Sequence, residues 1–217
     1  MIELQNVSYS HNKGYGVNNL NMSIKSGDFT FLIGPTGSGK TTLMRLLYFD
    51  LFPDSGIVKV NGYSSNKMNS RKVSKARINI GMVFQDYKLL LDRNLFDNIA
   101  LPLHVMGLTS SQISSRVDEA IELVGLEGKE NHFPEELSGG EQQRASLARA
   151  FIKEPDIILA DEPTGNLDPV ASFELVRLLE TIHETGTTVL MASHNYNLIK
   201  GRGRPIFELK NGILRVR

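Results

Sequence analysis

The stretch from Gly34 to Thr41 constrains this 217-residue chain more than any other. It reads Gly-Pro-Thr-Gly-Ser-Gly-Lys-Thr and fits the pattern G-x-x-x-x-G-K-[ST]. An apolar run at 29–33 precedes it, and a segment of helical length without a breaker follows at 42–49. This order of strand, loop and helix is the context in which the pattern binds nucleotide phosphates. A short glycine-rich turn without a ligand is the alternative, which an eight-residue match in this context disfavours.

Each residue type in this loop suits phosphate chemistry. Glycines let the backbone turn its N–H groups inward around a phosphate, and the following helix adds the positive end of its dipole. Lys40 supplies a point charge for the β- and γ-phosphates, and the Thr41 hydroxyl is suited to ligate Mg²⁺. The predicted nucleotide-binding residues here are Gly34, Pro35, Thr36, Gly37, Ser38, Gly39, Lys40, Thr41 and Thr42.

The charge balance and the lack of cysteine limit the partners of the chain. Lys plus Arg and Asp plus Glu both number 24, so no global field attracts nucleic acid or an anionic membrane surface. The absence of cysteine excludes disulfides and thiolate metal sites. No apolar run approaches the roughly 18 residues of a spanning helix, and the first residues resemble a strand, not a signal peptide. We expect a soluble, cytoplasmic protein that contacts a membrane only through a partner.

The hydrophobic pattern predicts an α/β fold with an insertion. Residues 2–9 and 20–24 alternate apolar and polar side chains, which predicts antiparallel strands joined by a turn at 12–16. Two helical patterns later interrupt the alternation of strands and helices, and the tail alternates again around an Asn-Gly turn, which predicts a closing hairpin. We predict a nucleotide-binding core at 1–85 and 136–217 with an inserted helical subdomain at 86–135.

Polar side chains follow three buried strands of the predicted sheet. The carboxyl ends of parallel strands face the ligand crevice, so Gln85 is placed to reach a metal ion or a γ-phosphate. Asp161 suits Mg²⁺ coordination, and Glu162 can polarise an attacking water. His194 also ends a buried strand and has a reason to contact the γ-phosphate. Asp161 and Glu162 could alternatively cap the next helix.

A second phosphate-binding pattern begins at Ser138. Gly139 and Gly140 follow it and open a helical segment, so the sequence predicts a helix start with an unobstructed backbone and a second anion site. Two anion-binding helix starts in one chain are naturally used across a two-fold interface.

The base of a bound nucleotide would need an aromatic ring on which to stack, and the candidates are Tyr9, His11 and Tyr15. Each of these rings could equally be an aromatic at the edge of a strand that packs on the sheet.

Taken together, these residues resemble the nucleotide-binding subunits of ATP-binding cassette (ABC) systems over essentially the whole length. The resemblance implies an α/β P-loop NTPase with the ABC-ATPase fold, in which a RecA-like parallel core carries an N-terminal antiparallel β subdomain and an inserted α-helical subdomain. It rests on six motifs in the family's order: Walker A at 34–41, the Q-loop at Gln85, the signature at 137–142, Walker B at 157–162, the D-loop at 166–168 and the H-loop at His194.

Within that superfamily the chain is most similar to the FtsE family of cell-division ATPases. The segment at 83–98 carries this resemblance, supported by Val189 to His194. The segment at 161–168 is shared with lipoprotein-release and macrolide-export ATPases. The family usually has a tyrosine where this chain has His11, with Tyr9 two residues earlier.

The resemblance implies a head-to-tail homodimer that closes on ATP and opens on hydrolysis. Lys40 would hold the phosphates, Thr41, Gln85 and Asp161 would serve Mg²⁺, Glu162 would act as base, and His194 would contact the γ-phosphate. The partner's ATP would contact Ser138, Gly139, Gly140 and Gln142. The implied membrane partner is an FtsX-like protein that regulates cell-wall hydrolases and is reached through the insert.

Three alternatives remain from the sequence. The same enzyme could power lipoprotein release or macrolide export. A P-loop kinase of small molecules would give the Ser138 segment no role. A soluble ABC protein of DNA repair or translation would normally have two cassettes or long coiled coils, and the neutral charge disfavours strong nucleic-acid binding.

Overall fold

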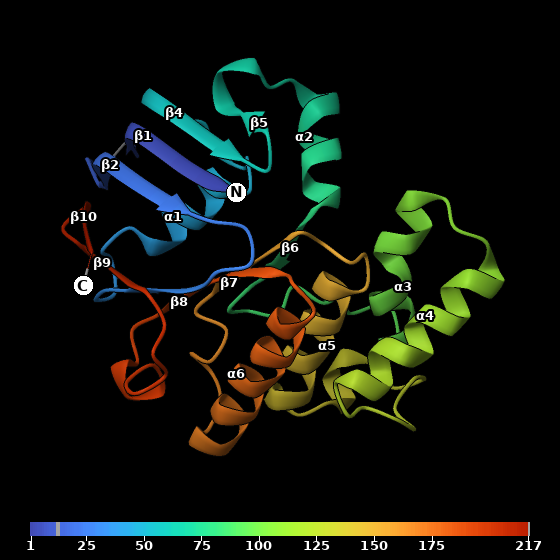
Figure 1. The fold of residues 1–217 in the computed structure, drawn as a ribbon. Coiled ribbons are helices and arrows are strands. Elements are labelled where there is room, and N and C mark those ends of the chain that lie inside the picture. The colour runs from blue at the N-terminus through green and yellow to red at the C-terminus, as the bar shows by residue number, and fades with distance from the viewer. Residues whose placement is uncertain (12–13, 217) are drawn as a thin grey trace.

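A four-stranded antiparallel sheet forms one side of the molecule in this computed structural model, which describes residues 1–11 and 14–216 (Figure 1). The strand order is β2-β1-β4-β5. These strands are β1 (Ile2–Ser10), β2 (Gly16–Ile24), β4 (Ser55–Val60) and β5 (Tyr63–Ser64). The antiparallel pairing of β1 with β2 confirms the predicted strand pair. Residues 12 and 13 of the predicted turn lie outside the described residues.

The second sheet has six strands in the order β10-β9-β3-β8-β7-β6. They are β3 (Phe29–Ile33), β6 (Ile80–Val83), β7 (Ile157–Asp161), β8 (Thr188–Ser193), β9 (Ile206–Lys210) and β10 (Ile213–Val216). All neighbours pair in parallel except β9 and β10, which form the predicted hairpin. Every residue of β3, β6, β7 and β8 is buried, which explains why these segments are predominantly apolar.

Helices cover both faces of the parallel sheet (Figure 1). Between the two sheets, Leu43 and Leu46 join an apolar cluster with side chains of both. On the opposite face, Leu147 and Leu175 pack in a second cluster with Val189. The helices are α1 (Lys40–Leu47), α2 (Ser70–Ile78), α3 (Leu95–Met106), α4 (Ser110–Leu123), α5 (Gly139–Phe151) and α6 (Pro169–Glu184), with short 3₁₀ turns at Ser65–Lys67, Pro134–Glu136 and Tyr196–Leu198.

The two helices of the predicted insert pack against each other and against α5. Leu103 of α3, Val117 of α4 and Ala148 of α5 belong to a third apolar cluster. A capping box at Thr109 starts α4, and Gly107 adopts a left-handed φ of 79° to end α3. The division at residues 86 and 135 stays a prediction, because α5, outside that division, shares this core.

The parallel arrangement of the strands places the predicted site residues at one edge of the sheet. Because β3, β6, β7 and β8 run in the same direction, their carboxyl ends lie together. The phosphate loop follows β3, Gln85 follows β6, Glu162 follows β7 and His194 follows β8. Four segments that are distant in sequence therefore meet at this edge.

Candidate nucleotide-binding site

A cavity of about 360 Å³ lies over the start of α1. Gly39 precedes the helix with a left-handed φ of 106°, and no side chain caps the first turn. The N–H groups at this helix start therefore point to a place that suits phosphate oxygens. Predicted site residues that line the cavity are His11, Thr36, Gly37, Gly39, Lys40, Thr41, Thr42, Gln85, Glu162 and His194.

Gly34 is required by a close approach between two backbones. A Cβ on this residue would lie 2.1 Å from the carbonyl oxygen of Leu209 in β9. The phosphate loop thus rests directly on the C-terminal hairpin. Gly37, three residues later, has a positive φ of 79°, but a Cβ there would meet nothing within 4 Å.

We expect Gly34→Ala to destabilise the protein by about 3 kcal/mol, because the added methyl forces β9 and the loop apart. Gly37→Ala in the same loop is the matched control. It adds only left-handed backbone strain, so its expected cost is about 1 kcal/mol. Urea unfolding followed by circular dichroism measures both. Equal costs for the two variants would contradict the contact with Leu209.

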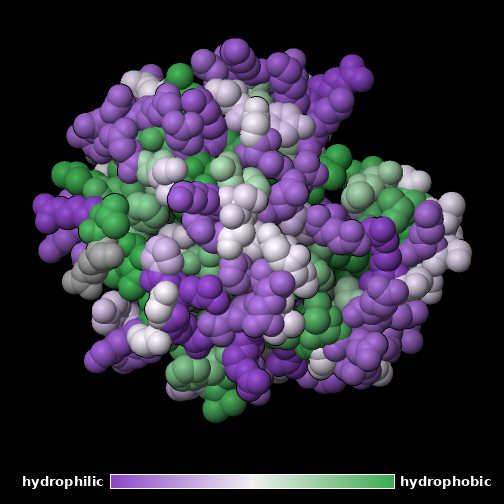
Figure 2. All heavy atoms as spheres, viewed as in Figure 1, coloured by the Kyte–Doolittle hydropathy of each residue, from purple (hydrophilic) through white to green (hydrophobic). Residues whose placement is uncertain are grey.

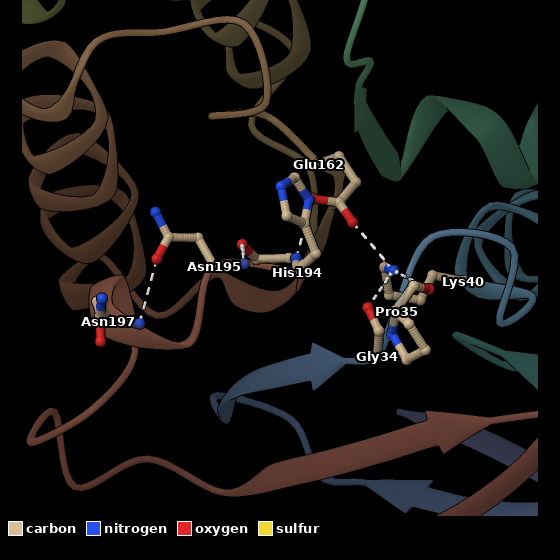
Figure 3. A network of polar contacts seen from close by, with 8 residues as sticks. Gly34, Pro35, Lys40, Glu162, His194, Asn195 and Asn197 are labelled. Atoms are coloured by element: carbon tan, nitrogen blue, oxygen red, sulfur yellow. Dashed lines mark hydrogen bonds and ion pairs between the residues drawn. The ribbon is translucent and has the colours of Figure 1, made fainter.

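Three of the four catalytic candidates, Lys40, Glu162 and His194, form a single polar network, and Gln85 lies outside it (Figure 3). The Lys40 ammonium lies 3.0 Å from Oε1 of Glu162 and donates to the carbonyl oxygens of Gly34 at 2.6 Å and Pro35 at 3.1 Å. The other carboxylate oxygen of Glu162 accepts from the His194 backbone N–H at 3.1 Å and lies 2.8 Å from His194 Nδ1. Three residues predicted to contact substrate or water therefore bind one another here.

Lys40 and Glu162 form a buried ion pair within this network. The side chains of Lys40 and Glu162 are only 5% and 10% exposed, whereas His194 is 53% exposed. A buried ion pair requires further hydrogen bonds to offset its desolvation, and the loop carbonyls and the His194 N–H supply them. Glu162 also has a positive φ of 48°, a conformation that a non-glycine residue adopts mainly where its surroundings impose it.

Asp161 fits an incoming cation. Its Oδ1 is buried and has no hydrogen-bond partner, and burial raises the pKa of its carboxyl, while a hydrogen bond from Thr41 lowers it. Thr41 and Gln85 border both the first cavity and a neighbouring one that includes Asp161. Mg²⁺ prefers one or two carboxylates together with neutral and phosphate oxygens. Among the described residues no group of three or more His, Cys, Asp or Glu could hold a metal, so a magnesium site would rest on this smaller set.

The three aromatic candidates for base stacking lie in different places. His11 and Tyr15 line the cavity, and Tyr15 is 74% exposed. Tyr9 does not line it. Its ring packs edge-on against His11 at 4.9 Å between centroids and contacts the core between the sheets. The His11 Nε2 lies 3.1 Å from the Thr42 hydroxyl, which joins this ring to the first turn of α1.

The start of α5 carries a capping box in addition to the predicted pair of glycines. Ser138 caps the helix and forms a capping box with Glu141, whose carboxylate pairs with Lys129. The carboxylate accepts from both the backbone N–H and the hydroxyl of Ser138 at 2.8 Å. Gln142 turns back and donates to the Leu137 carbonyl at 2.9 Å. None of the predicted residues Ser138, Gly139, Gly140 or Gln142 lines the cavity over α1.

These contacts predict an acid-dependent contribution of Glu141 to stability. The hydrogen bond from Lys129 and those from Ser138 lower the pKa of Glu141 from 4.5 to about 2. The stabilisation is present above pH 4.5 and is lost as the pH falls toward 2. Because Lys129 is 37% exposed, we expect Glu141 to contribute only about 1 kcal/mol to the free energy of unfolding.

Urea unfolding of wild type and Glu141→Gln from pH 6 to pH 3 tests this. The difference between their free energies of unfolding should shrink as the pH falls. Glu119→Gln on the surface of α4 is the control. A difference that stays constant with pH would contradict the depressed pKa.

Comparison with known proteins agrees with this geometry. Residues 17–165 match the ABC transporter family. A solved dimeric ATP-binding cassette in a post-hydrolysis state, bound to ADP and Pi, superposes with a TM-score of 0.91 and 33% identity, covering 100% of this chain and 98% of that one. The chain belongs to the ABC transporter family and is an ABC-type ATPase. The comparison confirms the predicted fold class.

The chain is also similar to curated proteins named for a role in cell division. A protein of Mycobacterium tuberculosis named "Cell division ATP-binding protein FtsE" is 47% identical, with 99% of this chain and 94% of that protein covered. The FtsE protein of Escherichia coli strain K12 is 40% identical, with 99% and 97% covered. This chain is therefore similar to FtsE proteins over nearly its full length.

Proposed function

We propose that this chain is the ATP-binding and ATP-hydrolysing subunit of an FtsEX-like cell-division complex. In this role it would dimerise on ATP and act on an FtsX-like integral membrane protein that regulates peptidoglycan hydrolases. The observation that carries the proposal is the 47% identity to an FtsE protein over 99% of the chain. The buried network of Lys40, Glu162 and His194 supplies the chemistry that this role needs.

The residues of the site have distinct tasks in the proposed reaction. Lys40 leaves Glu162 and the loop carbonyls to bind the β- and γ-phosphates. Glu162, released from that pair, accepts a proton from the attacking water while the His194 backbone N–H keeps its carboxylate oriented. His194 contacts the γ-phosphate from the exposed side. Asp161, Thr41 and Gln85 would hold Mg²⁺, which would supply positive charge beside the phosphate oxygens.

The two predicted phosphate-binding segments of the chain do not meet at one cavity, which supports the proposed dimer. The start of α5, with Ser138, Gly139, Gly140 and Gln142, does not line the cavity of its own chain. A second copy related by a two-fold axis would bring its α5 start to this cavity and complete it. The dimeric ATP-binding cassette bound to ADP and Pi, at 33% identity, supports this arrangement.

Apolar side chains on the insert offer a surface for the membrane partner. Val105 is 77% exposed and Leu91 75% exposed, and Leu101 and Met106 lie nearby in sequence with more than a third of their surface exposed. Figure 2 shows hydrophobic atoms gathered at the upper end of α3. In the described part of the chain no helix has the length and apolarity to cross a bilayer. We therefore propose a peripheral location at the cytoplasmic side of the inner membrane, through the partner.

Affinity purification of the chain from its own membranes, with ATP present, tests the proposal. Recovery of an FtsX-like protein supports it, and loss of that protein with Val105→Asp would place the contact on α3. Recovery of a lipoprotein-release or macrolide-export subunit would replace the cell-division role. Phosphate transfer to a small acceptor, without release of inorganic phosphate, would replace it with a kinase.

A further inference from the structure

The loop that carries Gln85 is held by side chains at three of its backbone carbonyls. Phe84 O accepts from Gln143 Nε2 at 3.3 Å, Gln85 O from Asn166 Nδ2 at 3.2 Å, and Tyr87 O from an N–H of Arg149 at 2.8 Å. No regular strand or helix contains these loop residues. Side chains from outside the loop therefore help to hold it in place.

Backbone strain in the loop makes these donors necessary. Tyr87 and Lys88 have positive φ values of 59° and 52°. Non-glycine residues in this region cost free energy and persist where surrounding contacts impose the conformation. The Arg149 hydrogen bond acts directly on the carbonyl of Tyr87, the first of the two strained residues.

Two of the three donors lie on α5. Gln143 is fully buried, and its amide oxygen has no hydrogen-bond partner. Arg149 is also in contact with Oδ1 of the buried Asn98 on α3, at 3.4 Å. Within the described part of the chain Arg149 has no carboxylate within 4 Å, so its contacts are with neutral oxygens. The guanidinium thus links the Gln85 loop, α5 and α3.

We propose that Arg149 and Gln143 are positioning residues that set where Gln85 presents its side chain at the triphosphate site. The inference rests on the proposed role of Gln85 in holding Mg²⁺. Gln85 reaches the cavity from a loop, and a loop alone does not fix a side chain within the few tenths of an ångström that metal ligation needs. The two α5 side chains supply that constraint together with Asn166. The position of α5, whose first residues would meet the second copy's ATP, is thereby tied to the metal site.

Binding of Mn²⁺ to the full-length chain loaded with a non-hydrolysable ATP analogue, measured by electron paramagnetic resonance, tests this independently of turnover. Arg149→Met should weaken Mn²⁺ binding by roughly tenfold, and Arg149→Lys, which keeps one donor, by less. Arg116→Met on α4, where the arginine forms a surface ion pair with Glu154, is the matched control and should bind Mn²⁺ as wild type does. Gln143→Leu removes the other α5 donor and replaces it with a side chain of similar volume. If Arg149→Met does not fold, the same Mn²⁺ measurement is made on Gln143→Leu.

Gln85→Ala distinguishes the positioning role of Arg149 from the proposed role of Gln85 in holding the metal ion. If it weakens Mn²⁺ binding and a folded Arg149→Met does not, the positioning role is wrong while the proposed role of Gln85 stands. If Gln85→Ala binds Mn²⁺ as wild type does, both are wrong. The double variant Gln85→Ala/Arg149→Met should be no weaker than Gln85→Ala alone, because Arg149 acts only through Gln85. Additive losses would overturn the inference.

Discussion

Replacing Glu162 with glutamine should lower ATP turnover by about 10²–10⁴-fold while the protein stays folded and binds ATP. The amide cannot accept a proton from water, but it can still accept the hydrogen bond from the His194 N–H. Release of inorganic phosphate measures turnover, and size-exclusion chromatography with ATP should show a trapped dimer. Normal turnover in this variant would remove Glu162 from the mechanism.

The same substitution should also raise ATP affinity, by about tenfold. In the nucleotide-free protein the carboxylate of Glu162 competes with phosphate for the Lys40 ammonium, and an amide competes less well. Isothermal titration measures this with ADP and ATP. Glu174→Gln, which removes an exposed glutamate on α6, is the control. Unchanged affinity in Glu162→Gln would mean that the pair does not oppose nucleotide binding.

Lys40→Met should lower ATP affinity at least about 100-fold, because the charge-assisted contacts to the phosphates are lost. It should also lower the free energy of unfolding by about 3 kcal/mol, because it leaves a buried carboxylate without its ammonium partner. Nucleotide titration and urea unfolding measure the two effects. Lys59→Met, which breaks an exposed pair with Glu3, is the control and should change neither.

The double variant Lys40→Met/Glu162→Gln distinguishes the two effects of the lysine. Removing both charges should recover most of the lost stability, since no buried charge remains unpaired. ATP affinity should stay low, because the phosphates still lack their cation. Recovery of both properties together would show that Lys40 acts on the nucleotide only through folding.

Local sequence patterns predicted the fold and the edge of the sheet where the site lies. Continuous apolar runs gave the buried strands β3, β6, β7 and β8, and the polar residues immediately after them are brought together, because parallel strands end at one edge. The capping residues Thr109 and Asp168 were also predictable, since helix starts depend on local hydrogen bonds.

Contacts between distant side chains were not predictable in the same way. The pair between Lys40 and Glu162 joins residues that each have a separate role in the sequence pattern, and no local rule indicates that they satisfy each other. At the start of α5, Ser138 and Glu141 do form a recognisable capping-box pattern, so this local contact was predictable. The Lys129 partner of Glu141 lies in a separate loop and has no such signal.

The contact between Gly34 and Leu209 has a consequence for the order of events during synthesis. The phosphate loop leaves the ribosome before β9 does, because Gly34 precedes Leu209 in the chain. A nascent chain that has not yet reached Leu209 therefore lacks the backbone on which the phosphate loop rests. We therefore expect ATP to stabilise the folding chain only after β9 has docked beside β3.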